Sequence, residues 1–239
     1  MSAPRKLVIA IDGPAGSGKS TIAARVARRL GYVNLESGAM YRALALKAQE
    51  NDISFDDAEG LRRLAENSTI QLEPQGEGNR VLLDGRDVSR RIREEDVTAA
   101  ASRVSIHPLV RQLMVARQRE FGTHGGVVME GRDIGTAVFP DADVKIFLDA
   151  DAAVRAERRV LQNGSHSAAD AQRVQAEIVA RDERDRTRVA SPLVPASDAV
   201  IVDTTHKTID EVVAEVESIV DSVRRGQAIA SPEKRKTAG

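Results

Sequence analysis

The chain has 239 residues, 41% of them hydrophobic, and its 35 Lys and Arg against 36 Asp and Glu give a net charge of −1. This length suits one α/β domain with an insertion or two small domains. A near-neutral chain has no global attraction to nucleic acid, so an anion site has to be built locally. The absence of Cys excludes disulfides and thiol nucleophiles and is compatible with a reduced cytoplasm. No apolar run approaches the length of a membrane span, so we expect no membrane partner. The near-neutral charge leads us to expect no nucleic-acid partner either.

A glycine-rich loop follows the first apolar run of the sequence, and that run spans residues 7–11. The loop reads Gly13-Pro14-Ala15-Gly16-Ser17-Gly18-Lys19-Ser20 and matches the complete Walker A pattern. In such a loop the backbone N–H groups surround a polyphosphate, the lysine reaches the β and γ phosphates, and the final hydroxyl binds Mg²⁺. Ile22, Val26 and Leu30 then recur at a spacing of four, which predicts an amphipathic helix whose positive dipole end faces the phosphates.

Strand and helix patterns alternate along the rest of the chain, which predicts a parallel sheet with helices on both faces. Gly31 is expected to end the first helix, and Ser37 with Gly38 to open a second one. The remaining strands are expected at residues 32–35, 127–129, 144–148 and 199–202.

An antiparallel hairpin interrupts this series. Residues 69–73 and 80–84 have extended patterns, and residues 74–79 between them are rich in turn formers. A hairpin inside a series of strand–helix units indicates an inserted subdomain, at about residues 38–105. Beyond Arg225 the tail has no periodicity and is expected to be disordered.

Other nucleotide-binding signatures do not account for the chain. The base-reading Asn-Lys-x-Asp of GTPases and the dinucleotide pattern G-x-G-x-x-G are both missing. Residues 57–60 match the switch pattern D-x-x-G, but they open a polar helix without a preceding strand, so we interpret the match as chance. Instead, Arg42 and Arg132 follow predicted strands as Lys19 does, and ligands of doubly wound sheets bind beyond such strand ends. These three cations could converge on phosphate.

The motifs resemble, in order, those of bacterial cytidylate (CMP) kinases, a nucleoside monophosphate kinase family of P-loop proteins. The resemblance spans about residues 7–220 and rests on residues 11–19, 37–42, 130–136, 138–142, 145–148, 181–188 and 192–193. It implies an α/β P-loop three-layer fold with a parallel central sheet flanked by helices. It also implies an inserted NMP-binding subdomain with a small antiparallel sheet at about 38–105 and a short lid at about 151–190, within a single domain of residues 1–225. Glu36 departs from the Asp that is usual in the family, and the tail at 226–239 looks longer than the family's typical end.

The activity implied by the resemblance is ATP-dependent phosphorylation of CMP and dCMP to CDP and dCDP, by in-line transfer in a cytoplasmic monomer with Mg²⁺. Holding two polyanions together requires cations around the transferring group, which agrees with the residue types. By resemblance, the ATP site comprises Gly13, Pro14, Ala15, Gly16, Ser17, Gly18, Lys19, Ser20, Thr21 and Arg158, with Ser20 as the metal ligand. The CMP site comprises Ser37, Arg42, Ser102, Arg111, Arg132, Asp133, Arg181, Asp185 and Arg188. Lys19, Arg132 and Arg188 are expected to be catalytic.

The resemblance also assigns roles within the CMP site. Arg42, Arg132 and Arg188 would hold the acceptor phosphate. Ser102, Arg111 and Asp133 would read the cytosine edge, while Arg181 and Asp185 would contact the ribose and its neighbouring phosphate. Arg155, Arg158 and Arg159 share one helical face in the lid region, so one or more of them could reach the donor phosphates.

Purely structural explanations compete with several of these roles. Ser37 suits a helix N-cap, Ser102 could bond back to its own turn, and Asp133 could pair locally with Arg132. The run at 181–188 could be a solvated helix with paired charges. For the whole chain, a small-molecule kinase of the shikimate or gluconate type would share the loop without needing the hairpin insertion. A non-catalytic ATP-binding regulator would lack the second set of arginines.

Overall fold

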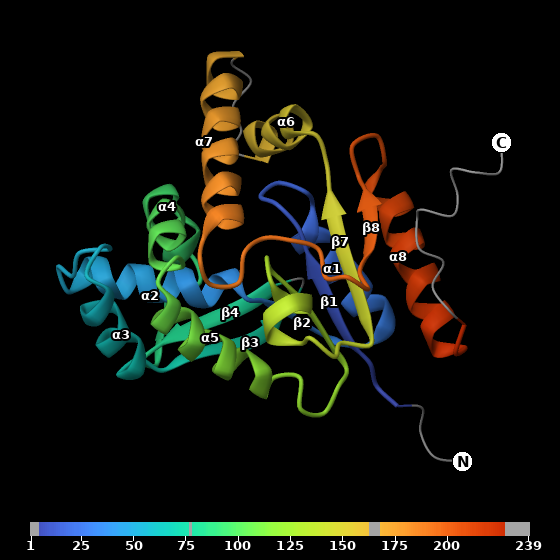
Figure 1. Ribbon diagram of the computed structural model, residues 1–239, viewed down its shortest axis with the longest axis horizontal. Helices are drawn as coiled ribbons and strands as arrows, with labels where there is room; N and C mark the ends of the chain where they lie inside the picture. Colours follow the sequence, from blue (N-terminus) through green and yellow to red (C-terminus); the bar gives the residue numbers. More distant parts are fainter. Residues whose placement is uncertain (1–4, 77, 163–167, 228–239) are drawn as a thin grey trace.

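The computed structural model describes residues 5–76, 78–162 and 168–227, so most of the tail predicted at 226–239 lies outside the described residues. Five parallel strands form the central sheet in the order β2-β6-β1-β7-β8 (Figure 1). They are β1 (Val8–Asp12), β2 (Val33–Glu36), β6 (Val127–Glu130), β7 (Val144–Asp149) and β8 (Val200–Asp203). All five predicted strands are therefore confirmed to within one residue at each end.

Each of these strands ends on a carboxylate one residue beyond its last apolar position. The five are Asp12, Glu36, Glu130, Asp149 and Asp203. The apolar pattern stops earlier because only the buried part of a strand needs apolar side chains. Strand pairing continues to the edge of the sheet, where polar side chains meet the loops. The carboxyl edge of the sheet therefore presents a row of acids to the segments that follow the strands.

Helices cover both faces of the sheet, which gives the predicted three layers. On one face, Ile9 and Ile11 of β1 pack with α1 (Lys19–Leu30) and α8 (Ile209–Arg224). On the other, Ala10 belongs to a core shared with α2 (Gly38–Glu50), α4 (Glu95–Val104) and α5 (Pro108–Glu120). Alternate residues of a strand point to opposite faces, so β1 serves both cores. Within the described ranges, no helix combines the length and the apolar content that a bilayer crossing requires.

Glycines mark both ends of α1. Gly18 precedes the helix at φ 90°, and Gly31 ends it at φ 66°, both in the left-handed region that favours glycine. The predicted end of the first helix at Gly31 is confirmed. Because the chain turns sharply at Gly18, the helix begins directly at Lys19 and points its free backbone N–H groups at the loop.

The segment between β2 and α5 holds the predicted hairpin. It contains α2, α3 (Ala58–Glu66) and a three-stranded antiparallel sheet of β3 (Ile70–Gln75), β4 (Gly78–Leu83) and β5 (Arg86–Asp87). A 3₁₀ turn (Arg91–Arg93) then leads into α4. The predicted turn at 74–79 is too long, because Pro74 pairs with Asn79 and Gln75 with Gly78. Pro74 is tolerated since β3 is an edge strand, where a missing N–H costs no ladder bond.

Two helices rise beyond the carboxyl edge of the sheet. After β7 the chain forms α6 (Ala152–Gln162) and α7 (Ala168–Thr187), which stand at the top of Figure 1. Ala156 and Val160 of α6 pack against Val174 and Ile178 of α7 in a small core of their own. A short π-helical turn (Ile134–Val138) follows β6 below them. The two helices and residues 131–133, just before this turn, lie around the space next to the Walker A loop.

Candidate active site

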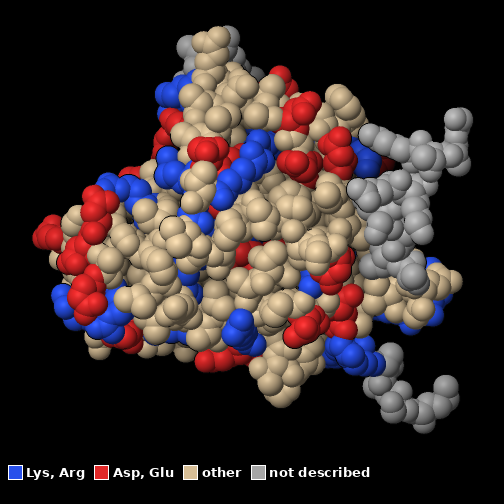
Figure 2. All heavy atoms as spheres, viewed as in Figure 1, with Lys and Arg blue, Asp and Glu red and all other residues tan. Residues whose placement is uncertain are grey.

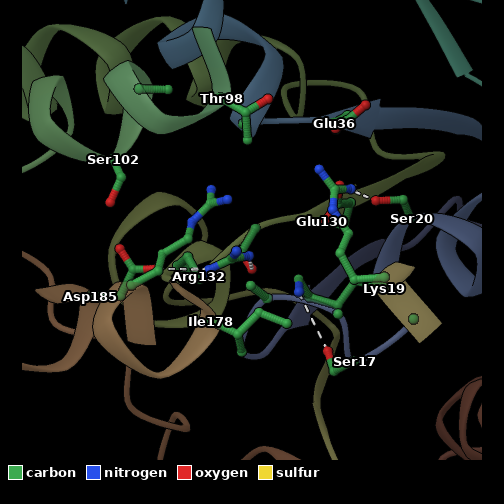
Figure 3. A pocket seen from close by; sticks show the side chains of 18 of the residues that line it. Ser17, Lys19, Ser20, Glu36, Thr98, Ser102, Glu130, Arg132, Ile178 and Asp185 are labelled. Atoms are coloured by element: carbon green, nitrogen blue, oxygen red, sulfur yellow. Dashed lines mark hydrogen bonds and ion pairs between the residues drawn. The ribbon is translucent and has the colours of Figure 1, made fainter. Parts of the chain in front are cut away.

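A cleft of about 1430 Å³ opens at the carboxyl edge of the sheet. It is lined by the loop after β1, the start of α2, the inner face of α4, the segment after β6, and the facing sides of α6 and α7. Figure 3 shows Ser102 of α4 across this cleft from Lys19 of the loop, with Arg132 lying between them in this view. Every predicted site residue lines the cleft except Gly13 and Pro14, which lie behind its wall.

The surface around the cleft agrees with a locally built anion site. Figure 2 shows Lys and Arg side chains gathering between α7 and the tip of β7 on the face that it draws, with Asp and Glu side chains beside them. Both signs are interspersed over the same face, as the net charge of −1 predicts. The group between α7 and the tip of β7 lies beside the cleft, while other cations are spread over the same face.

The Walker A loop packs closely on the neighbouring strand. A Cβ at Gly13, where φ is 147°, would lie 2.0 Å from the carbonyl oxygen of Leu148, so no side chain fits there. Lys19 is buried, and its Nζ donates to the carbonyl oxygen of Pro14 at 2.6 Å and to Ser17 Oγ at 3.4 Å (Figure 3). In this arrangement the lysine is folded back along its own loop.

Several cations approach the lysine. Burial lowers the pKa of the Lys19 ammonium, and the neighbouring Arg132 and Arg181 lower it further, against the opposing charge of Glu130. Burial and Arg132 also lower the pKa of Arg181, to about 10. The Nε of Arg181 is buried and has no hydrogen-bond partner among the residues that the structure describes. This part of the cleft therefore holds more positive charge than its protein partners neutralise, which favours an anionic ligand.

Ser20 and Glu130 form an oxygen pair at the end of the loop. Ser20 Oγ donates to Glu130 Oε1 at 2.9 Å (Figure 3). Burial and the neighbouring Glu36 raise the pKa of Glu130. Sequence reasoning missed a role for Glu130. The available signal was an acid directly after the predicted strand at 127–129, where ligands of such sheets bind. In the described part of the chain, no group of three or more His, Cys, Asp and Glu side chains has the spacing of a metal site.

Asp12 shapes the turn after β6. Its two carboxylate oxygens accept from the backbone N–H groups of Ile134 and Gly135, each at 2.7 Å. Burial raises its pKa to about 7, although both hydrogen bonds act to lower it. The turn that carries Arg132 and Asp133 is thereby fixed to the strand that carries the Walker A loop.

The start of α2 provides a second cationic group. Arg42 Nη2 pairs with Glu36 Oε1 at 2.6 Å, and the same carboxylate approaches Arg93 at 3.4 Å. Burial alone would raise the pKa of Glu36, but Arg42 and Arg93 hold it below its ordinary value. Ser37 does not cap α2, and that alternative is wrong. Its buried hydroxyl donates to the carbonyl oxygen of Glu130 at 2.8 Å instead, because Ser37 has helical φ and ψ angles.

Arg132 and Asp133 pair with different partners within one ion-pair network, since Arg188 approaches both Asp185 and Asp133 at 3.5 Å. Arg132 Nε donates to Asp185 Oδ2 at 3.0 Å. Asp133 pairs with Arg111 and approaches Arg188 at 3.5 Å. The alternative of a local pair between the two neighbours is therefore wrong: their side chains leave the turn in different directions. Arg111 also lies over the ring of Tyr41, 5.3 Å from its centroid, which adds a cation–π contact.

The charged run at 181–188 is not a solvated helix surface. Asp182, Asp185 and Arg188 are buried, so this structural alternative is wrong. The alternative for Ser102 is also wrong, because its Oγ accepts from Arg184 Nε at 3.2 Å instead of bonding back to its own turn. These contacts bring the end of α7 against α4 across the cleft.

The three arginines of α6 that were expected in the lid region differ in position. Arg155 is buried outside the cleft lining, where Nη1 donates to the carbonyl oxygen of Ala15 at 2.9 Å. Arg158 lines the cleft, and its guanidinium donates to Thr204 Oγ1 at 3.0 Å and to the Thr204 carbonyl at 2.6 Å. Arg159 lines the cleft as well. Arg155 therefore supports the Walker A loop. The expectation that it faces the cleft together with Arg158 and Arg159 is wrong.

A Walker A loop after the first strand of a parallel sheet, faced by buried arginines across one cleft, defines the class of P-loop kinases. The family model for cytidylate kinase matches residues 9–222, and the chain belongs to the cytidylate kinase family. Membership of this family sets aside the shikimate- or gluconate-type kinase and the non-catalytic regulator.

Curated relatives agree with this assignment. A cytidylate kinase of Enterococcus faecalis is 51% identical over 216 residues, which cover 90% of this chain and 96% of that protein. A cytidylate kinase of Syntrophotalea carbinolica is 44% identical over 235 residues, covering 98% of this chain and 99% of that protein. A cytidylate kinase of Geobacillus kaustophilus is 48% identical over 218 residues, which cover 91% of this chain and 97% of that protein. The second alignment extends into the C-terminal tail, so a tail of this length is not peculiar to this chain.

Proposed function

We propose that the protein transfers the γ-phosphoryl group of ATP to CMP and dCMP, giving ADP with CDP or dCDP. This proposal rests on one observation. The Walker A loop lines the same cleft as four arginines, which are Arg42, Arg132, Arg181 and Arg188. Two anionic ligands can be held end to end there, one by the loop and one by the arginines. Membership of the cytidylate kinase family supports the nucleotide pair.

On the donor side, the backbone N–H groups of the loop and the start of α1 would bind the ATP phosphates. Lys19 would leave the Pro14 carbonyl for the transferring phosphate, and Arg158 and Thr21 lie in the same part of the cleft lining. Ser20 and Glu130 fit Mg²⁺, because a hydroxyl and a carboxylate oxygen 2.9 Å apart are hard ligands of the kind it takes beside substrate phosphates. When bound, Mg²⁺ supplies charge neutralisation at the transferring group.

On the acceptor side, Arg42, Arg132 and Arg188 would hold the phosphate of CMP. Ser102, Arg111 and Asp133 would read the cytosine edge, with Ser37 beside them, and Arg181 and Asp185 would contact the ribose and its neighbouring phosphate. An acceptor phosphate oxygen, already anionic at neutral pH, would attack in line. No covalent intermediate with the protein is needed, since positioning and electrostatics supply the rate.

We further propose that residues 1–225 act as one domain, with the segment at about 38–105 as the acceptor-binding insertion and the segment at about 151–190 as a closing lid. The contact of Arg184 with Ser102 joins these two segments across the cleft. Three of the large exposed apolar side chains, Val33, Leu109 and Val189, lie on β2, on α5 and just after α7. This scatter supports a monomer. A reaction that consumes ATP and CMP supports a cytoplasmic location.

The test is an assay of ADP release with CMP, dCMP, UMP, AMP, shikimate and gluconate as acceptors. We expect turnover with CMP and dCMP, and a loss of about 100-fold or more in kcat for Lys19→Met with an unchanged circular dichroism spectrum. The matched control is Lys47→Met, which removes a lysine that pairs with Asp84 outside the cleft lining. Turnover only with a non-nucleotide acceptor, or near-normal kcat in Lys19→Met, would contradict the proposal.

A further inference from the structure

The lid helices hold the Walker A loop at one residue, Ala15. Asp182 of α7 accepts from the Ala15 N–H at 3.2 Å, and Arg155 of α6 donates to the Ala15 carbonyl at 2.9 Å. Asp182 and Arg155 also pair with each other, and their exposed fractions are only 2% and 5%. Arg155 Nε donates to the carbonyl of Ala150, which fixes the guanidinium at the end of β7. The pair therefore has a defined orientation when it meets the loop.

The contact at Ala15 reaches Lys19 through one peptide group. The Ala15 N–H and the Pro14 carbonyl belong to the same planar peptide. Its N–H donates to Asp182, and its carbonyl oxygen accepts from Lys19 Nζ at 2.6 Å. Because the plane is rigid, the direction of the N–H determines the direction of the carbonyl. Asp182 thus sets the orientation of the group on which the lysine rests.

The same helix also contacts the acceptor side of the cleft. Asp185 lies one turn beyond Asp182 and pairs with Arg132 at 3.0 Å. Arg188, just past the end of α7, approaches Asp133 at 3.5 Å. Residues three apart lie on the same face of a helix, so these contacts belong to one side of α7. A shift of the helix that alters the acceptor contacts also alters the contact at Ala15.

We propose that Asp182, oriented by Arg155, is a positioning residue for phosphoryl transfer that couples the Walker A loop to the acceptor site through α7. It acts on the Pro14–Ala15 peptide and, through that peptide, on Lys19. The inference rests on the proposed function and deepens it, because it names the residue that makes donor binding depend on the acceptor.

The test compares Asp182→Asn with Glu183→Gln. Both changes remove one carboxylate charge from α7, but Glu183 is exposed and outside the cleft lining. We measure kcat, the KM for ATP and the dissociation constants of CMP and of a non-hydrolysable ATP analogue, the latter with and without CMP. In the parent we expect CMP to tighten analogue binding by about 5-fold or more, a usual size for coupling between sites. In Asp182→Asn the factor by which CMP tightens analogue binding should fall to near 1, and kcat should fall by about 10-fold or more. The affinity for CMP in the absence of the analogue should stay within about 3-fold of the parent value.

Arg155→Lys provides a second variant should Asp182→Asn fold poorly. It keeps a positive charge beside Asp182 but cannot donate to Ala150 and Ala15 from a planar fork. The coupling factor should fall in this variant also, while Glu183→Gln keeps the parent values. A purely structural role of Asp182 would lower stability towards urea and leave the coupling factor intact, and this result would overturn the inference. A parent protein in which CMP does not change analogue binding would overturn it as well. A parent that does not phosphorylate CMP would instead refute the proposed function.

Discussion

Asp133 lies between two buried guanidinium groups. Arg111 and Arg188 approach its carboxylate from different elements, α5 and the end of α7. The two arginines hold this carboxylate in place. In the base-reading role proposed above, it would accept from the amino group of cytosine but would face the lone pairs of uracil O4. Removing the side chain entirely would leave both arginines without their shared counter-charge. The informative change is therefore one that keeps the shape of Asp133.

We expect Asp133→Asn to lower kcat/KM for CMP by about 10-fold or more and to lower it much less for UMP, since an amide can donate to uracil O4. Arg42→Ala should weaken both acceptors about equally, because a phosphate contact carries no base information. Steady-state kinetics of both variants on both nucleotides provide the measurement. Equal losses on CMP and UMP for Asp133→Asn would assign this residue to organising the arginines alone.

We expect Lys19 to make ATP binding depend on pH. Burial, Arg132 and Arg181 lower its pKa in the ligand-free cleft, whereas the phosphates of a bound nucleotide would raise it again. Between these two pKa values the amine is neutral in the free protein and charged in the complex. Binding therefore takes up as much as about one proton, and the affinity for ATP should decrease as the pH rises through this window.

Isothermal titration calorimetry in buffers of different ionisation enthalpy measures this proton uptake directly. In the variant Lys19→Arg the uptake should disappear, because a guanidinium stays protonated throughout. An unchanged uptake in Lys19→Arg would mean that another group, such as Asp12 with its pKa raised to about 7, takes the proton.

At the scale of secondary-structure elements, the side chain of Asn79 joins the hairpin to the edge of the main sheet by hydrogen bonds. Buried Asn79 of β4 donates to the carbonyl of Asn34 at 2.8 Å and accepts from the N–H of Glu36 at 2.9 Å. β2 is an edge strand, so one of its sides has no neighbouring strand. The Asn79 amide makes hydrogen bonds with β2 of the kind that a neighbouring strand would make. The contact fixes the end of β2, where Glu36 holds Arg42.

We expect Asn79→Ala to lower the free energy of unfolding by about 1–3 kcal/mol, because it leaves two backbone groups of β2 without partners. The KM for CMP should also rise, since Glu36 and Arg42 lose their support. Urea denaturation and steady-state kinetics measure the two effects. Gln71→Ala, an exposed change on β3 of the same hairpin, should alter neither quantity. A loss of stability with an unchanged KM would show that the hairpin does not position Arg42.

At the scale of the whole molecule, the cleft lies between two segments that meet at its rim. Arg184 of α7 donates to Ser102 of α4 at 3.2 Å, and Arg173 approaches Glu95 at 3.3 Å. Both pairs join α7 to α4. Closure of such a cleft excludes water from the transferring phosphoryl group.

We expect backbone amides of α6 and α7 to exchange more slowly with solvent when an ATP analogue and CMP are bound together than when either is bound alone. Hydrogen exchange followed by mass spectrometry provides the measurement. Helix α3 lies outside the cleft lining and should show no such change. An absence of added protection in α6 and α7 under double ligation would contradict a closing lid.

The sequence by itself determined the local parts of this protein. The strands follow from short apolar runs, α1 from its spacing of apolar residues, and the loop from glycines at positions with positive φ, such as Gly16 and Gly18. The ordered motifs identified the cytidylate kinase family. All of these properties depend on residues close together in the chain, and a sequence pattern records such neighbours directly.

Only the tertiary structure decided which charges meet. Ser20 meets Glu130 across 110 positions, and Ala15 meets Asp182 across 167. Asp133 pairs with Arg111 instead of the adjacent Arg132, and Arg155 supports the loop instead of facing the cleft. These partners depend on the strand order β2-β6-β1-β7-β8 and on how α7 lies over the cleft. Spacing along the chain does not contain that information, because long-range pairs form only once packing of the apolar cores has fixed the elements in space.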